Sequence, residues 1–427
     1  MRLVHAADLH LDSPLRGLAR LGDSDLADTL RGATRRACEN LVDQTIAHQA
    51  DALLLAGDVY DGDWRDYATG AFFVRQLARL DDAGIPVFLI NGNHDAESEI
   101  TRSLRLPSNT HRLSVDAPET VVLDDVGLAV HGQGFARRAV VENLVPAYPD
   151  RIQGLVNVGM LHTSVQGDDR HDTYAPCRPD DLSGCGYEYF ALGHIHEQRV
   201  VCDGPHVAAF SGNLQGRHPQ ETGAKGALVV DVEPGERATL TPLTLDVARW
   251  ELVVVDAAGC TDGDDVLDAV ESALRERCVQ AAPRAVVAQV TLTGSTRAAP
   301  ALTDAEWLRS EIDLLAAKAG AVVEKIRNRT GPPADALIVD PELTDAVAAA
   351  ASGLVDDPDR VRELAAGLER EIGRPLREAG LLDLRDPDRL AGLARQAEQQ
   401  LLAQLAGTPE SSGRGTGVGT ESGEGGA

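Results

Sequence analysis

The sequence predicts an α/β fold built from strand–helix–strand units around a buried sheet. Up to about residue 246, short apolar runs alternate with stretches whose apolar residues recur at helical spacing. The apolar runs are continuous instead of alternating with polar residues, which is typical of strands covered on both faces. Strand, helix and strand at this interval indicate βαβ units.

Six apolar runs are predicted as strands: residues 2–8, 51–58, 87–93, 127–135, 156–162 and 189–196. Residues 30–50 and 66–84 separate the first three runs and are predicted as helices. In the second of these helices, Phe72, Phe73, Leu77 and Leu80 share one face. We therefore expect a catalytic domain over residues 1–246 with its helices packed on the sheet.

The character of the sequence changes after residue 246. Residues 251–256, 285–294 and 321–326 are predicted as strands and residues 264–278 and 303–319 as helices, with Thr303 and Glu306 forming a capping box. These elements make a small α+β capping domain over residues 247–330. Residues 331–406 have two helical apolar stripes and are predicted as a partner-docking segment. Residues 407–427 are rich in Gly and Ser and are predicted to be disordered.

Composition excludes several classes of protein. No apolar run approaches the roughly 20 residues that span a bilayer, and the first residues do not resemble a signal peptide, so we expect a cytoplasmic location. The six cysteines include no Cys-x-x-Cys pair, which argues against a disulfide framework or a zinc-thiolate site. A net charge of -27 argues against a protein that grips nucleic acid over its whole surface. It does not exclude nucleic acid bound at a metal-lined cleft.

Polar side chains with metal-binding chemistry follow the ends of the predicted strands. Asp8 and His10 are two residues apart, so in an extended segment both would project on the same side. The other candidates, in chain order, are Asp58, Asn93, His94, Asp95, His162, His194 and His196. Open α/β folds keep their sites at the carboxyl ends of strands. Oxygen and nitrogen donors without a thiolate suit Mn, Fe or Zn and are poorly suited to Ca.

Each fragment taken alone has a simpler interpretation. An Asp-x-His or His-x-His pair after a strand is explained by capping and by a hydrogen-bonded histidine. A turn with positive φ explains Gly92, but it does not explain His94. Five such fragments, all at strand ends, are not explained by turn chemistry. The ordered set therefore predicts a metal site.

The order Asp-x-His, Gly-Asp, Gly-Asn-His-Asp, His and Gly-His-x-His resembles the calcineurin-like metallophosphoesterases. The stretches HAADLHLDSPLRGL, APCRPDDLSGCGYEYFALGHIHEQRVV and FSGNLQGRHPQETGAKGALVVDV are similar to a bacterial DNA-repair exonuclease branch of that family. The resemblance is specific over about the first 245 residues, and only the layout matches beyond them. It implies a four-layered αββα sandwich with two metals at its edge.

The resemblance also implies how the metals are held. Two divalent ions are expected, Mn²⁺ before Fe or Zn, and Asp58 would bridge them. One ion would be bound by Asp8, His10 and His196, and the other by Asn93, His162 and His194.

Catalytic and substrate-binding roles follow from the same resemblance. His94 would contact the scissile phosphate and protonate the leaving oxygen, while a metal-bound hydroxide attacks the phosphodiester. Asp95 would accept a hydrogen bond from the other ring nitrogen of His94 and set its tautomer. Arg217 and His218 are candidates for binding a phosphate backbone, and a structural turn explains them equally well.

Other polar residues are interpreted more simply. Asp12 and Asp61 could support the ligands, but a surface or turn role is the favoured interpretation. His5, His131 and His206 are interpreted as core or surface histidines. Relatives in the nuclease branch often have a second histidine shortly after the bridging aspartate, and the stretch GDVYDGD has none.

Three functions are open at this point. The first is a two-metal DNA exonuclease or endonuclease in DNA repair, working with an SMC-like coiled-coil ATPase that docks on the C-terminal helices. Those helices could equally fold back on the protein, and a homodimer is an option. The second is a metallophosphoesterase acting on a nucleotide or another small phosphate ester, which the acidic charge favours. The third is a non-catalytic scaffold that keeps the fold.

Overall fold

The computed structural model describes residues 1–13, 25–61, 67–97, 104–165 and 173–333, together with short stretches between residues 345 and 397. Its contacts group the chain into two units. The first contains Met1–Val255, Asp268–Thr291 and Arg309–Arg327, and the second contains Asp256–Leu267, Leu292–Leu308 and Asn328–Ala427. The boundaries expected after residues 246, 330 and 406 remain predictions. The tail 407–427 and much of the predicted docking segment lie outside the described residues.

The first sheet of unit one has six strands, and four of them are parallel neighbours as the βαβ pattern predicted. In the register of these parallel pairs, Leu3 lies opposite Ala52 and Leu53 lies opposite Val87. Two antiparallel strands complete the sheet beyond the first strand. In spatial order the strands are β12 (Thr239–Thr244), β11 (Gly226–Asp231), β1 (Arg2–Ala6), β2 (Ala52–Leu55), β3 (Val87–Leu89) and β4 (Thr110–Arg112).

The second sheet of unit one also has six strands, with a parallel centre and an antiparallel strand at each edge. Its strands are, in spatial order, β5 (Glu119–Leu123), β6 (Leu128–Gly132), β7 (Val156–His162), β8 (Tyr189–Gly193), β10 (Val207–Phe210) and β9 (Arg199–Asp203). All six predicted strands of the catalytic region are confirmed as β1, β2, β3, β6, β7 and β8.

Apolar side chains from both faces of each sheet build a sandwich of four layers. Phe88 of the first sheet and Met160 of the second belong to one buried cluster, which fills the space between the sheets. On the outer face of the first sheet, Leu41 and Phe73 of the helices α2 (Ala33–Ala47) and α3 (Tyr67–Asp82) are buried with Leu55. Each such side chain contributes roughly 1.5–3 kcal/mol when fully buried.

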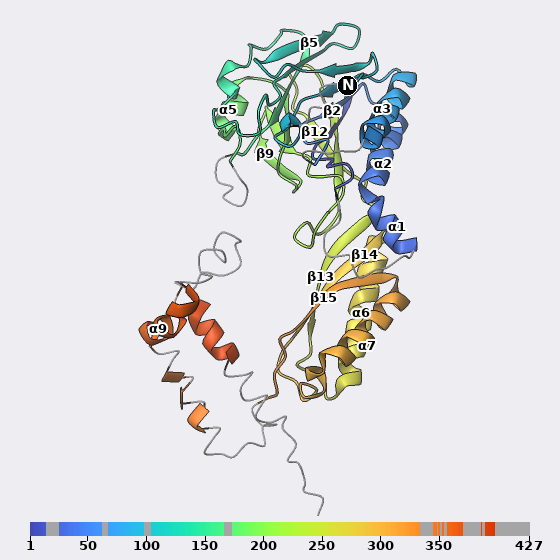
Figure 1. The fold of residues 1–427 in the computed structure, drawn as a ribbon. Helices are drawn as coiled ribbons and strands as arrows, with labels where there is room; N and C mark the ends of the chain where they lie inside the picture. The colour runs from blue at the N-terminus through green and yellow to red at the C-terminus, as the bar shows by residue number, and fades with distance from the viewer. Residues whose placement is uncertain are drawn as a thin grey trace, which may run out of the picture. The chain divides into compact units, whose positions relative to one another are not determined.

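The outer face of the second sheet is covered by a shorter helix, α5 (Pro179–Gly184), and by the 3₁₀ turn η2 (Val145–Ala147). Leu182 of α5 is buried with Phe190 and Phe210 of the sheet. Figure 1 shows α2 and α3 (blue) on one outer side of the sandwich and α5 (green) on the other. The predicted αββα arrangement is confirmed.

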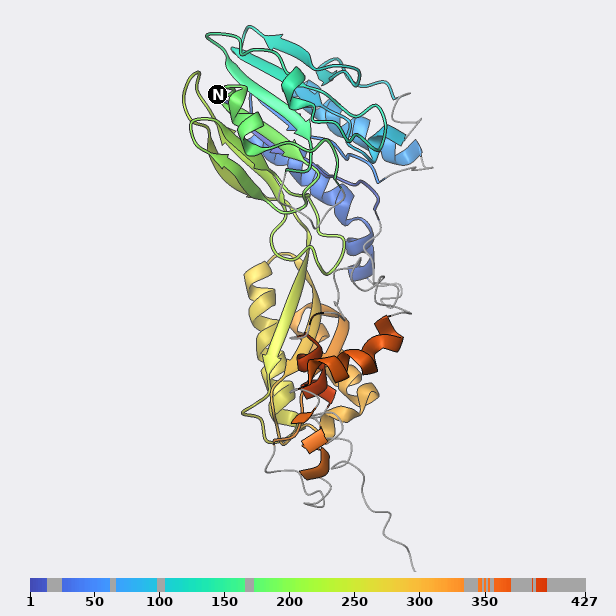
Figure 2. The same cartoon turned by 90° about the vertical axis from the view of Figure 1, so that its left-hand side faces the viewer.

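A third sheet follows the sandwich in the chain. Its strands are β13 (Ala248–Asp256), β14 (Ala285–Thr293) and β15 (Ala321–Asn328), with β14 in the middle. Helices α6 (Gly263–Ala281) and α7 (Ala305–Ala319) lie along it (Figure 2). The three strands and two helices expected after residue 246 are confirmed. The remaining described elements are α1 (Asp25–Arg31), η1 (Asp95–Glu97), η3 (Ala301–Thr303) and α9 (Pro358–Leu368).

The predicted capping box at Thr303 and Glu306 is wrong. Thr303 belongs to the 3₁₀ turn η3, and its hydroxyl donates to the carbonyl of Pro300 at 2.6 Å. Asp304 caps α7 instead, because its Oδ1 accepts the backbone N–H groups of Glu306 and Trp307, each at 3.0 Å. A carboxylate one residue later serves the same orphan donors and also favours the positive end of the helix dipole.

The two sheets approach each other closely at the carboxyl ends of β2 and β8. The ring Nδ1 of His162 lies 2.9 Å from the carbonyl oxygen of Ala56, which joins the sheets. A Cβ atom added to Gly193 would overlap that carbonyl oxygen and the ring of His162. Glycine at this position therefore allows the close contact on which the candidate site depends.

We expect Gly193→Ala to lower the free energy of unfolding by about 1–3 kcal/mol, because the backbone must move to admit the methyl group. Urea unfolding measures this change. Gly184→Ala is the matched control, since a Cβ there meets no atom within 4 Å. Equal stability of the two variants would contradict the close approach.

Candidate metal centre

The candidate site lies at the carboxyl ends of strands from both sheets. Asp8 and His10 follow β1, Asp58 follows β2, and His194 follows β8. All four adopt positive φ angles, of 52°, 41°, 52° and 102° respectively. The expectation that Asp8 and His10 share one side of an extended segment is therefore wrong. Non-glycine residues with positive φ are uncommon and cluster at functional sites, where the surrounding structure holds them.

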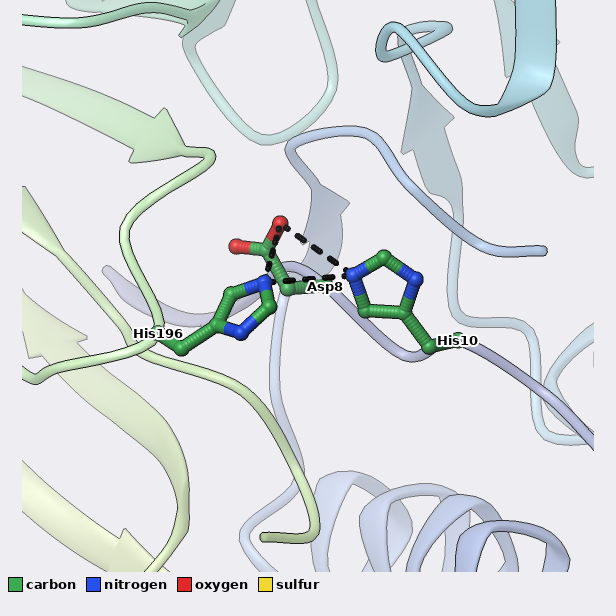
Figure 3. A group of neighbouring side chains, drawn as sticks. All are labelled: Asp8, His10 and His196. Carbon is green, nitrogen blue, oxygen red and sulfur yellow. Dashed lines mark hydrogen bonds and ion pairs between the residues drawn. The ribbon is translucent and has the colours of Figure 1, made fainter. Parts of the chain in front are cut away.

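The first donor group consists of Asp8, His10 and His196. The Nε2 atoms of the two histidines are 3.2 Å apart, and the Asp8 Oδ1 atom lies 4.0 Å from His10 Nε2 and 3.7 Å from His196 Nε2. Figure 3 shows the carboxylate and both rings pointing toward one another. Residues from β1 and from the segment after β8 thus meet, although 186 positions separate the two histidines.

The second donor group consists of Asp58, Asn93 and His162. The Nε2 atom of His162 lies 3.4 Å from Asp58 Oδ2 and 3.1 Å from Asn93 Oδ1. Asp58 also lies between the groups, because its Oδ2 is 3.9 Å from His10 Nε2. His162 is fully buried, and Asp58 and Asn93 are nearly so. This placement of Asp58 is the one that a carboxylate shared by two ions needs.

The hydrogen bonds around these groups leave the Nε2 lone pairs of His196 and His162 facing other acceptor atoms when both rings are neutral. His196 Nδ1 lies 2.5 Å from Glu221 Oε1, and His162 Nδ1 lies 2.9 Å from the carbonyl of Ala56, so each Nδ1 is the donor. Each Nε2 is then an acceptor that faces other acceptors. Such an arrangement needs protons or metal ions between the atoms, and ligands around a divalent ion lie roughly 3–3.5 Å apart. The donor set therefore fits two divalent metals.

His194 is less clearly part of the cluster. Its ring centroid lies 5.4 Å from that of His162 and 5.3 Å from that of Tyr174. Its backbone N–H donates to both oxygens of Asp8, at 3.2 and 3.0 Å. The structure thus places His194 beside the second donor group, and its assignment as a ligand remains a prediction.

Electrostatics also favour positive charge at the site. Burial raises the pKa of Asp8 above its ordinary value. Burial acts most strongly and lowers the pKa of His162, but the charge and hydrogen bond of Asp58 and the charge of Asp8 together outweigh it and raise the pKa to about 9. By contrast, burial lowers the pKa of His10 to about 4, so this ring is neutral at pH 7. Without metals the cluster holds protons, and metal ions take their place.

Metal affinity is expected to rise with pH until His162 loses its proton. Because the pKa of His162 is raised to about 9, protons compete with metal at every lower pH, by up to about tenfold per pH unit. Calorimetric titration of the metal-free protein with MnCl₂ between about pH 6 and pH 8.5 measures this dependence. A constant affinity in the unsubstituted protein would contradict the assignment.

The environment of His94 differs from the predicted one. Asp95 does not accept from its ring: the Asp95 oxygens accept the backbone N–H groups of Gly92, Val59 and Tyr60 at 3.0, 3.3 and 3.1 Å. Asp95 therefore shapes the turns around the site, and burial raises its pKa to about 6. Both oxygens accept backbone N–H groups, and neither forms a hydrogen bond with the imidazole of His94.

Asp61 takes the place that was expected for Asp95. Its Oδ1 lies 3.5 Å from His94 Nδ1 and 3.4 Å from His10 Nδ1, and the hydroxyl of Ser13 donates to its Oδ2 at 2.8 Å. The favoured surface interpretation of Asp61 is wrong. A hydrogen bond to His10 holds the pKa of Asp61 well below its ordinary value, although burial opposes this. His94 also lies within reach of His10 and Asp58, so its separation from the metals remains a prediction.

The other candidates are placed as follows. Asp12 points away from the cluster and forms an ion pair with Arg35, so its structural interpretation holds. Arg217 lies beside the site, with Nη1 3.6 Å from Asp61 and Nη2 3.4 Å from His196 Nδ1. His218 lies 3.2 Å from Glu221.

Glu221 is a site residue that sequence reasoning missed. It is 6 % exposed and its Oε1 contacts the ring of His196. Burial acts to raise its pKa, but the hydrogen bond with His196 holds it far below the ordinary value. The sequence signal was weak: one glutamate three residues after His218, in a stretch that reads as a turn.

A four-layered sandwich with Asp, His and Asn donors gathered at its strand ends defines a metal-dependent phosphoesterase, a hydrolase of phosphate esters. The family comparison agrees. Residues 1–198 match the calcineurin-like phosphoesterase family, and residues 250–331 match the middle domain of metallophosphoesterase YhaO. The chain belongs to the calcineurin-like metallophosphoesterases.

Three curated relatives are similar to this chain. The uncharacterized metallophosphoesterase YhaO of Bacillus subtilis is 32 % identical over 72 % of this chain and 73 % of its own length. A component of the nuclease SbcCD of Bacillus subtilis is 26 % identical over 59 % of this chain and 72 % of its own. The DNA double-strand break repair protein Mre11 of Aeropyrum pernix is 27 % identical over 64 % of this chain and 67 % of its own length. Among the described helices, none has the length and apolarity that crossing a bilayer requires.

Proposed function

We propose that the chain is a cytoplasmic two-metal nuclease that hydrolyses DNA phosphodiesters in DNA repair. The observation that carries this proposal is the cluster of facing acceptors around Asp58, with the imidazole of His94 beside it. Two relatives named as a nuclease and as a DNA break repair protein support the choice of DNA as substrate. The proposed metals are Mn²⁺, with Fe or Zn as alternatives.

The metals, when bound, supply Lewis-acid activation of water and of the phosphoryl oxygen. Asp8, His10 and His196 would hold one ion, Asn93, His162 and His194 the other, and Asp58 both. His94 would donate a proton from its ring to the leaving oxygen. Asp61, 3.5 Å from His94 Nδ1, would orient that ring so that Nε2 faces the substrate.

Arg217 is the proposed contact for a substrate phosphate. Its side chain is 14 % exposed, and its Nε has no hydrogen-bond partner among the described residues. A buried guanidinium N–H without a partner is costly, and a phosphate oxygen would satisfy it. His218, which is more exposed, is proposed to assist on the same side.

The experiment that tests the proposal crosses metals with substrates. Metal-free protein is reloaded with Mn²⁺, Mg²⁺ or Zn²⁺ and assayed on DNA ends, hairpins and single strands, with Asp58→Ala as the blank. We expect Mn²⁺-dependent cleavage of DNA that the blank lacks. No cleavage of any DNA by protein that carries two metals would reject a nuclease.

The net charge of -27 favours one alternative, a phosphoesterase acting on a nucleotide or another small ester. An acidic chain attracts a duplex weakly, whereas a small ester needs few basic contacts. Turnover of bis-p-nitrophenyl phosphate without cleavage of any DNA would select this alternative.

An SMC-like coiled-coil ATPase is the proposed partner. The helix α9 has apolar residues on one face, and Leu364 there is 67 % exposed, which supports a docking role for the C-terminal segment. Truncation after residue 338 should abolish co-purification with the ATPase. Persistence of the complex would show that this segment does not dock it.

A further inference from the structure

The segment of residues 211–223, between β10 and β11, contacts both the metal centre and the strand β13. We infer that Glu221 in this segment is a positioning residue for the metal ligand His196, and that Trp250 of β13 acts on His196 through Glu221. This inference rests on the proposed two-metal site. It identifies the residues that control the metal site formed by Asp8, His10 and His196.

Glu221 holds His196 from the side opposite to the metal-facing nitrogen. Its Oε1 lies 2.5 Å from His196 Nδ1, so it accepts the ring proton and leaves Nε2 free as a ligand. Its Oε2 accepts the backbone N–H of Arg217 at 2.7 Å and the side-chain amide of Asn213 at 3.1 Å. Both carboxylate oxygens are thus fixed, and the position of the carboxylate follows the segment.

The segment is in turn fastened to β13. The amide of Gln215 donates to the carbonyl of Ala248 at 2.6 Å and accepts the N–H groups of Val247 and Ala248 at 3.0 and 3.2 Å. The indole Nε1 of Trp250 donates to the carbonyl of Gly216 at 3.1 Å. Gly223 N–H donates to the carbonyl of Trp250 at 3.2 Å.

Close packing makes this link stiff. Trp250 is 1 % exposed and is buried with Leu30 and Val287. A Cβ added to Gly216 would lie 2.6 Å from the carbonyl oxygen of Glu221 and 3.1 Å from Trp250 Cδ1. Because the backbone of Glu221 and the indole leave no room for even a methyl group, a shift of Trp250 displaces the glutamate.

This link should affect only one of the two metal sites. The second donor group of Asp58, Asn93 and His162 is held by Ala56 and by the turn after β3, and its hydrogen bonds within the described part of the chain do not involve this segment. A change at β13 should therefore alter the metal held by Asp8, His10 and His196 and leave the other metal in place. Through this link, β13 would set the occupancy of one metal site.

The test is a titration of metal-free, full-length protein with MnCl₂, followed by calorimetry and by the electron paramagnetic resonance of coupled Mn pairs. Two binding events are expected in the unsubstituted protein, and His196→Asn and His162→Asn assign them. Glu221→Gln should weaken the event assigned to His196 by about 10–100-fold and leave the other unchanged. Trp250→Phe, which removes the indole N–H and part of the buried ring, should weaken the same event by about threefold or more.

The double variant decides whether Trp250 acts through Glu221. We expect Trp250→Phe to add nothing in the Glu221→Gln background, whereas independent effects would add. Trp307→Phe and Glu188→Gln are matched controls away from the segment and should leave both events unchanged. If Trp250→Phe does not fold, Gly216→Ala perturbs the same packing without removing a hydrogen bond.

Additive effects, equal weakening of both events, or no effect of Trp250→Phe would overturn the inference while the two-metal proposal stands. Failure of the unsubstituted protein to bind two Mn²⁺ ions would instead reject the proposed function itself.

Discussion

Asp58→Ala is expected to reduce metal-dependent turnover by at least about a thousandfold and to lower the metal content below two ions per chain. Asp58 Oδ2 is the one carboxylate oxygen within 4 Å of both His10 and His162 among the described residues. Without it, the second donor group has no carboxylate and the first keeps only that of Asp8, so the cluster lacks the charge that two divalent ions need. Metal analysis by mass spectrometry and initial rates on DNA or on bis-p-nitrophenyl phosphate measure both effects.

Asp12→Ala is the matched control for this substitution. Asp12 lies four residues from Asp8 in the sequence, but its carboxylate contacts Arg35 and Thr69 instead of the cluster. The control should lower the free energy of unfolding and leave the metal content at two. Retention of both metals and of most turnover in Asp58→Ala would mean that no bridging carboxylate exists.

His94→Gln is expected to keep both metals but to lose about 10²–10⁴-fold in turnover, because it removes the proposed proton donor to the leaving oxygen. The ring is 30 % exposed, in contrast to the buried ligands, and its Nδ1 is occupied by Asp61. A residue that the substrate must reach has to be accessible in this way. Metal content and turnover, measured on the same sample, separate this role from that of a ligand.

His206→Gln serves as the control, because that ring contacts the carbonyl of Tyr187 away from the cluster. Asp61→Asn should cost less turnover than His94→Gln, since it disturbs the orientation of the ring without removing the proton donor. Loss of a metal from His94→Gln would show that this imidazole is a ligand and that the predicted division of roles is wrong.

The sequence predicted the central strands well because each is a continuous apolar run that ends in a polar residue. It did not predict the edge strands β5, β9 and β12, whose residues are all partly or fully exposed and mix polar with apolar side chains. Such strands form because a neighbouring strand offers unpaired hydrogen-bonding groups, and their own composition carries little signal. The strands β10 and β11 are buried and apolar, yet they lie in a stretch where turn residues dominate the pattern.

The candidate site divides in the same way. Which residues reach the strand ends could be predicted, because a strand end is a local property of the sequence and its residue types are distinctive. Which side chains contact one another could not be predicted. Asp8, His10 and Asp58 have positive φ angles, and these redirect side chains that an extended backbone would have placed elsewhere.

The class of fold, the family and the set of polar residues at the strand ends could thus be derived from the amino-acid order. The folded chain was needed to show that Asp61 contacts His94, that Asp95 binds the backbone, and that Glu221 holds His196. These contacts join loops from two sheets whose spacing is set by core packing. Small shifts in that packing choose between neighbouring carboxylates, and no local pattern records the choice.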